Sequence, residues 1–150
     1  MLLSDAIMLG STHTTLDSTI WYSKENQCGC LIGMGLFGSG ATKDVDDTEM
    51  DSEFVIRTFP WLGENRFEMP EQVRFFKVKH GFDIPCVGFG SGFPEGAAIE
   101  IISGMARMIR NGEWTLEQAV DWIRQNEPAE TPEEKREIVE AFCDNLVAQQ

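Results

Sequence analysis

The sequence predicts a mainly α-helical protein that forms one compact domain over residues 1–150. Its last third contains three segments with the spacing of apolar residues that is typical of amphipathic helices. Hydrophobic residues make up 42% of the chain and include ten Phe and four Trp, which is enough to build a core. We therefore expect three C-terminal helices, short N-terminal helices and, as an open alternative, a small β element in the middle.

The first element that we expect is a short helix over residues 3–10. Ser4 is a favourable N-cap, Asp5 suits the positive end of a helix, and Gly10 can close it in the left-handed conformation. Residues 11–27 are rich in Ser, Thr and Asn, and predict a loop or a short strand around Trp21 and Tyr22.

The middle of the chain contains an acidic run and a segment with two interpretations. Residues 43–53 hold little apolar material and predict an exposed acidic loop. Pro70 can open a helix over residues 71–78, with Gly81 ending it. The alternation of apolar and basic residues at 76–79 leaves a strand as the alternative.

Three helices are expected in the C-terminal part. Residues 94–109 place one apolar stripe on a helix, and Gly112 follows its end. Thr115 and Gln118 fit a capping box that opens the next helix, with Trp114 and Ala119 as its hydrophobic staple.

Thr131 and Glu134 fit a second capping box, which opens the last helix. The spacing of Ile138, Phe142 and Val147 predicts that these three side chains face the core.

The net charge of −13 is unevenly distributed. Residues 1–53 contain nine acidic residues against two lysines, and residues 94–150 contain twelve against five basic residues. Direct binding to nucleic acid is disfavoured, because that affinity comes from Lys and Arg neutralising phosphates, whereas a protein with a basic surface would be attracted. The predicted interaction residues are Asp44, Asp46, Asp47, Glu49, Asp51 and Glu53.

The cellular location is predicted from what the sequence lacks. No stretch approaches the roughly 20 apolar residues of a membrane span. The opening MLLSDAIMLG has no basic region and contains Asp5, which is unlike a secretory signal. Four unevenly spread cysteines then favour reduced thiols and a cytoplasmic protein.

Gly33, Gly35 and Gly38 match the GxGxxG pattern of dinucleotide-binding turns. That turn needs a strand before the glycines and a helix after them, whereas here the acidic run follows. We therefore interpret the glycines as positions of close packing. A second glycine run, at 88–92, is interpreted as a loop that leads into the next helix.

Cys28 and Cys30 could hold zinc only with two further ligands, for which His13, His80 and Cys86 are the candidates. No second close pair of ligands exists, so we predict no metal and no cofactor, with the thiols as small buried hydrophobes. With only two histidines and no nucleophile motif, catalytic residues are not predicted.

Four segments resemble an uncharacterised group of small bacterial and phage proteins, over about half of the chain. These segments are LSDAIMLG at 3–10, CLIGMG at 30–35, FPWL at 59–62 and WTLEQAVDWI at 114–123. They match the LSxAIxLG, CxIGx, PW and WTxEQxxDW patterns of the group. Many members also have a Cys-x-x-Cys knuckle, where this chain has only Cys86, so a zinc role is not implied.

Together these features predict a non-enzymatic, acidic accessory protein of bacterial or phage origin that binds a protein with a basic surface. One alternative is an inhibitor that mimics nucleic acid and occupies the cleft of a DNA- or RNA-binding defence protein. A second alternative is a small metal or redox enzyme that uses Cys28 and Cys30. Mimicry requires one continuous acidic face, and an enzyme requires a deep pocket with polar groups.

Overall fold

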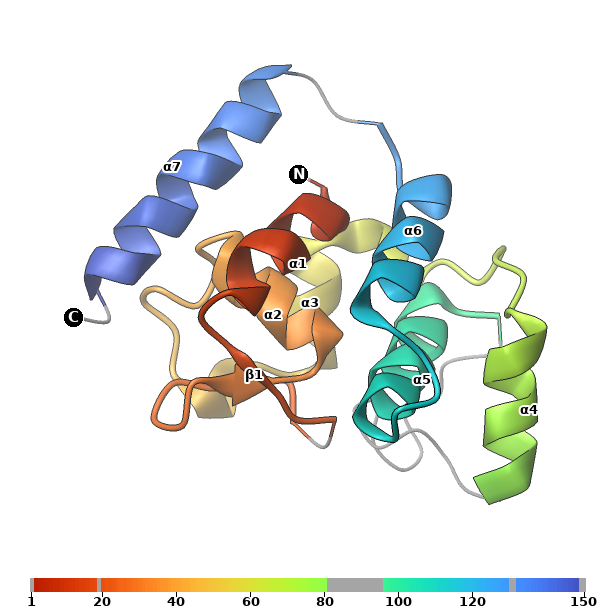
Figure 1. Cartoon of the computed structure of the whole chain (residues 1–150). Coiled ribbons are helices and arrows are strands. Elements are labelled where there is room, and N and C mark those ends of the chain that lie inside the picture. The colour runs from red at the N-terminus through yellow and green to blue at the C-terminus, as the bar shows by residue number, and fades with distance from the viewer. Residues whose placement is uncertain (1, 19, 81–95, 130–131, 149–150) are drawn as a thin grey trace.

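The computed structural model describes residues 2–18, 20–80, 96–129 and 132–148, without the side chains of 132–138. The prediction of a mainly α-helical fold with a small β element is confirmed (Figure 1). In chain order, the elements are α1 (Leu3–Ser11), β1 (Thr15–Leu16), β2 (Tyr22–Ser23), β3 (Cys28–Gly29), α2 (Leu31–Gly38), the 3₁₀ turn η1 (Asp47–Glu49), α3 (Ser52–Thr58), the 3₁₀ turn η2 (Pro60–Gly63), α4 (Glu71–His80), α5 (Ala98–Arg110), α6 (Leu116–Asn126) and α7 (Pro132–Ala148).

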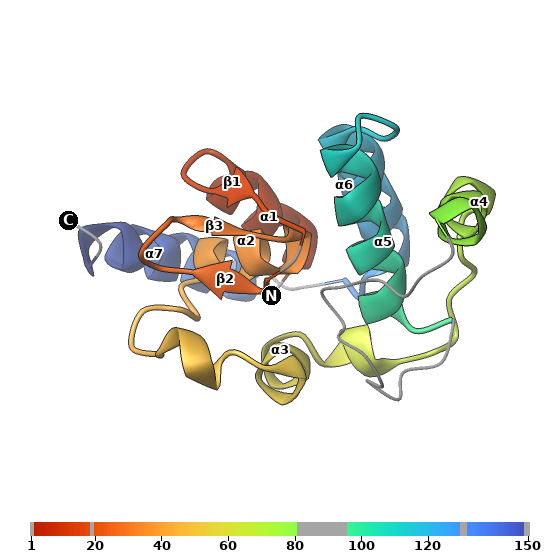
Figure 2. The ribbon, with the colours of Figure 1, turned by 90° about the horizontal axis from the view of Figure 1, so that it is seen from below.

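The helices are arranged around α2, which is the most deeply buried element. All eight residues of α2 are buried, and α1, α3, α5 and α7 contact it. Helices α5 and α6 pack beside each other, and α4 lies against α5 at the far edge of the molecule (Figures 1 and 2). One continuous cluster of buried apolar residues extends from Leu3 in α1 to Phe142 in α7.

The β element is a three-stranded sheet with the order β1-β3-β2. Strand β3 is parallel to β1, with Thr15 opposite Cys28, and antiparallel to β2, with Tyr22 opposite Gly29. The sheet lies within residues 15–29, near the predicted strand at Trp21 and Tyr22, and not in the middle of the chain.

Helix α1 begins differently from the prediction. Its N-cap is Leu2, and the predicted cap, Ser4, is a fully buried residue of the first turn. The Glu127 side chain, which follows α6, accepts hydrogen bonds from the Ser4 amide, at 3.1 Å, and from the Ser4 hydroxyl. A carboxylate from a distant segment thus takes the place of the local cap.

The prediction for Gly10 is also wrong. Positive φ angles occur among the described residues only at Gln27, Gly40 and Gly112, so Gly10 does not close α1 in the left-handed conformation. Gly10 instead lies inside α1, where a Cβ atom would overlap the carbonyl oxygen of Met34 in α2. It is needed for close contact between the two helices.

The segment with two interpretations, residues 71–80, is the helix α4, and the strand alternative is wrong. Val73 and Phe76 are buried on the side of α5. Between the two helices, the Lys77 Nζ atom lies 2.6 Å from the Glu100 Oε1 atom. The predicted stop, Gly81, lies outside the described residues, as does the glycine run at 88–92.

Helices α5 and α6 agree with their sequence signals. The predicted stripe of α5 is buried, with Ile109 at its edge half-buried, and Gly112 takes a φ of 78° just beyond the helix. The predicted capping box of α6 is confirmed. The Gln118 amide donates to the Thr115 Oγ1 atom at 3.1 Å, and the Thr115 amide donates to the Gln118 Oε1 atom at 2.9 Å.

Helix α7 packs on α2 through a face that was only partly predicted. Phe142 is buried, but Val147, predicted to face inward, is 71% exposed. Its place is taken by Asn145, which is 1% exposed and donates to the Phe37 carbonyl at 2.8 Å and to the Thr42 hydroxyl at 3.0 Å. The side chain of Ile138 and the predicted cap Thr131 lie outside the described part of the chain.

Candidate functional site

The acidic segment, residues 43–53, runs from the end of α2 through η1 into the first turn of α3, along one edge of the molecule (Figure 2). The structure places all six predicted interaction residues on the surface; they are Asp44, Asp46, Asp47, Glu49, Asp51 and Glu53. Asp44, Asp46, Glu49 and Glu53 form no ion pair with any described residue. Their charges are therefore directed to solvent.

This segment is held more firmly than a plain loop. Thr42 and Met50 are buried, at 0% and 5% exposure, and attach the segment to the core at two points. The Asp51 Oδ1 atom accepts a hydrogen bond from the Phe54 amide at 2.9 Å and caps α3. Both carboxylate oxygens of Asp47 lie within 3.3 Å of the Lys24 amide nitrogen. The segment thus presents its charges on an ordered backbone.

The glycine motif lies inside a helix and not in a turn before one. Gly33, Gly35 and Gly38 all belong to α2, which begins at Leu31. Cβ atoms at Gly33 and Gly38 would overlap the carbonyl oxygens of Trp21 and Ala6, respectively. Protein backbone thus fills the space in which a phosphate would lie, and the interpretation as close packing is supported.

Cys28 and Cys30 lie at the entrance to α2. Cys30 is fully buried, and its Sγ atom lies 3.9 Å from the Trp21 carbonyl oxygen. Burial, with the nearby charges of Asp17 and Asp47, raises the pKa of the Cys28 thiol. A thiol with a raised pKa is a poor nucleophile and a poor metal ligand at neutral pH.

The three other candidate ligands do not complete a metal site in the described part of the chain. The His13 ring lies against the rings of Phe37 and Phe142, with centroids 6.4 and 5.8 Å apart. The His80 ring lies 4.2 Å from that of Phe76, and Cys86 is outside the described residues. Within those residues, His, Cys, Asp and Glu form no group of three that could hold a metal ion.

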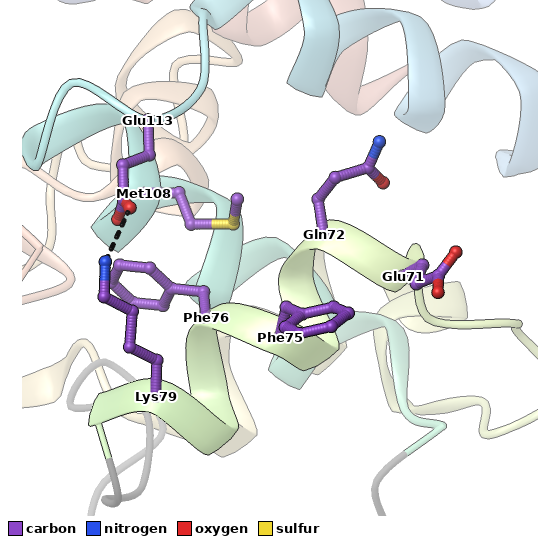
Figure 3. Close-up of a pocket in the computed structure, with 7 residues that line it drawn as sticks. All are labelled: Glu71, Gln72, Phe75, Phe76, Lys79, Met108 and Glu113. Carbon is purple, nitrogen blue, oxygen red and sulfur yellow. Dashed lines mark hydrogen bonds and ion pairs between the residues drawn. The ribbon is translucent and has the colours of Figure 1, made fainter.

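The structure shows a second candidate surface, on α4, that the sequence analysis missed. Phe75 and Val78 are 70% and 75% exposed. A hollow of about 520 Å³ lies between α4 and the end of α5, lined by Phe75, Phe76, Met108 and a Lys79–Glu113 ion pair of 3.4 Å (Figure 3).

A second hollow, of about 470 Å³, lies on the other side of Phe75. The signal for this surface was present in the sequence. Consecutive residues of a helix point about 100° apart, so Phe75 and Phe76 cannot both be buried against the same neighbouring helix.

No described helix is long and apolar enough to span a bilayer. Comparison with known proteins adds no further assignment to either surface, since no protein-family model, curated protein or solved structure matches the chain significantly.

Proposed function

We propose that this chain is a non-enzymatic accessory protein, of bacterial or phage origin, that binds a protein with a basic surface through residues 43–53. The observation that supports this proposal is the exposure of all six carboxylates on a segment attached to the core at Thr42 and Met50. An ordered backbone presents the charges without the entropic cost of ordering a flexible tail on binding. The bacterial or phage origin rests on the resemblance of four sequence segments.

Electrostatic attraction is the physical basis of the expected binding. Concentrated charge raises the association rate of proteins of opposite sign by about 10- to 1,000-fold at low salt. The effect weakens as ionic strength rises, because the Debye length falls to about 8 Å at physiological salt. Binding through this segment should therefore show a steep dependence of the association rate on salt.

The test compares two variants of equal net charge. The first neutralises the six residues of the acidic segment to Asn or Gln. The control neutralises six exposed carboxylates elsewhere; they are Glu64, Glu68, Glu117, Asp121, Glu140 and Asp144. Association rates are measured by surface plasmon resonance at several salt concentrations, against a basic protein first isolated on the wild-type chain.

We expect the first variant to associate about tenfold more slowly at low salt and the control to stay within about threefold of wild type. Equal slowing of both variants would show that only the total charge matters, and would contradict the proposal. If duplex DNA competes with this protein for the same partner, that partner binds nucleic acid. The acidic segment would then act by mimicking nucleic acid.

A further inference from the structure

Helix α4 has two faces with different surroundings. Its inner face, with Val73 and Phe76, is buried against α5 and fixed there by the ion pair between Lys77 and Glu100. Its outer face exposes Phe75 and Val78, and Phe75 is the one large aromatic side chain among the described residues that is strongly exposed. Residues three apart are neighbours on a helix surface, so Phe75 and Val78 form one contiguous apolar patch, and contiguous patches are the kind of exposed apolar surface that marks interaction sites.

The outer face also has a regular order of charges. Glu71, Phe75 and Lys79 are four residues apart, so they form one stripe along the helix, with the ring in the middle (Figure 3). Phe75 lines both hollows and forms a ridge between them. Phe76 and Met108, which are 5% and 2% exposed, form an apolar floor of the larger hollow.

We propose that this face binds the same face of a second copy of the chain, with the two α4 helices antiparallel across a twofold axis near Phe75. Glu71 and Lys79 are equally far from Phe75 in the sequence. An antiparallel pair therefore places Glu71 of each copy opposite Lys79 of the other, with the two Phe75 rings between them. A parallel pair would place like charges opposite each other.

The features of the face favour a second copy over an unrelated partner. A twofold interface must contain its own complement, because the same patch is used by both copies. Here one face of α4 presents both the Phe75 ridge and the hollow beside it, and both an acid, Glu71, and a base, Lys79. The remainder of the chain is strongly acidic, whereas residues 54–93 contain five basic residues against four acidic ones. Contact at this region therefore brings together the parts of the two copies that repel each other least.

The existing partner of Lys79 does not prevent this contact. Its Nζ atom lies 3.4 Å from the Glu113 Oε1 atom, and the two side chains are 68% and 39% exposed. An ammonium group has three N–H donors, so Lys79 can bind Glu113 and a second carboxylate together.

The dimer should be weak and dependent on concentration. One helix face with two central apolar side chains buries less than the roughly 1,200 Å² at the lower end of standard interfaces.

Figures 1 and 2 place α4 and the acidic segment at opposite sides of the molecule, so the dimer leaves that segment free. The inference is therefore independent of the proposed function.

The test is sedimentation equilibrium of the full chain from about 5 to 500 µM, a range chosen for a small interface. We expect wild type to dimerise in this range and Phe75→Ser to weaken the dimer at least about tenfold. Val147→Ser on α7 is the matched control, because Val147 is also about 70% exposed, and it should dimerise like wild type. Circular dichroism checks that both variants are folded.

Charge reversal tests the antiparallel arrangement. Glu71→Lys and Lys79→Glu should each weaken the dimer, because each creates two like-charge contacts, and the double variant should return to within about threefold of wild type. A chain that stays monomeric up to 500 µM would overturn the proposal, as would equal dimerisation of Phe75→Ser and wild type. Single reversals without effect would overturn the antiparallel arrangement.

Discussion

Replacing Gly38 with alanine should destabilise the protein by separating α1 from α2. A Cβ atom at this position would overlap the carbonyl oxygen of Ala6 and lie 2.9 Å from the amide nitrogen of Gly10. Both atoms belong to the backbone of α1, so no change of rotamer can make room. The helices must move apart, and the packing of the surrounding core side chains would loosen.

The magnitude follows from a comparison with Gly35. A Cβ atom there would meet the Cδ1 atom of Leu3 and, at 3.4 Å, the Cγ1 atom of Ile7, and both side chains can adjust. Each substitution gains about 1 kcal/mol of helix propensity, and overpacking costs about 1–3 kcal/mol, with the upper value where the backbone must move. We therefore expect Gly38→Ala to lower the free energy of unfolding by about 2 kcal/mol and Gly35→Ala to leave it nearly unchanged.

Thermal and urea denaturation, followed by far-UV circular dichroism, measure the difference. At about 2–4 °C per kcal/mol for a chain of this size, Gly38→Ala should melt about 4–8 °C below wild type. Gly63→Ala is the control, because the three atoms nearest to a Cβ atom there all belong to the side chain of Ile56, at ordinary contact distances of 3.4 Å or more. If Gly38→Ala melted at or above the temperature of Gly35→Ala, the account of α2 as a closely packed glycine helix would be refuted.

Three further predictions concern side chains that fix helix positions. Thr115→Ala removes one half of the capping box of α6 and should lower the free energy of unfolding, measured by urea denaturation, by about 1 kcal/mol. An unchanged free energy would mean that solvent replaces the cap. Asn145→Ala removes two buried hydrogen bonds, one to the Thr42 hydroxyl and one to the Phe37 carbonyl, which keeps the Gly40 amide as a donor at 3.0 Å. The loss should lower the free energy of unfolding by about 2 kcal/mol, measured in the same way. Burial raises the pKa of Glu127 above 4.5, although hydrogen bonds from Ser4 oppose the shift. Protonated Glu127 therefore stabilises the fold at low pH, and this contribution is lost as pH rises through the raised pKa. Glu127→Gln cannot ionise, so the stability of wild type relative to this variant should fall as pH rises from 4.5, and a constant difference would contradict the shift.

Helices α5 and α6 could be predicted because their signals are local. The apolar stripe of α5 and the capping box at Thr115 and Gln118 are read within one or two turns of the chain, and the structure retains both. Helix α4 could be read as helix or strand, because Phe76 and Val78 alternate with lysines. The burial of Val73 and Phe76, three residues apart, is what a helix against α5 requires.

The errors arose where distant residues decide the local structure. Ser4 has the chemistry of an N-cap, but it is engaged by Glu127, which lies 123 residues away. Val147 continues an apolar pattern, yet α7 turns a different face to α2 because Asn145 finds two buried acceptors there. A buried asparagine interrupts the apolar stripe, so periodicity alone could not identify that face.

The cap of α1 has a consequence for the order of events during synthesis. The close contact between α1 and α2 joins residues that all lie within the first 38 of the chain, so it can form early. The carboxylate that satisfies the Ser4 amide is made only when translation reaches Glu127. Until then, the first turn of α1 must keep its free amides in water. The N-terminal half can thus pack α1 against α2 as it emerges, but the first turn of α1 still lacks its hydrogen-bond acceptor. That acceptor comes from the last third of the chain, so the helix that is made first is completed late.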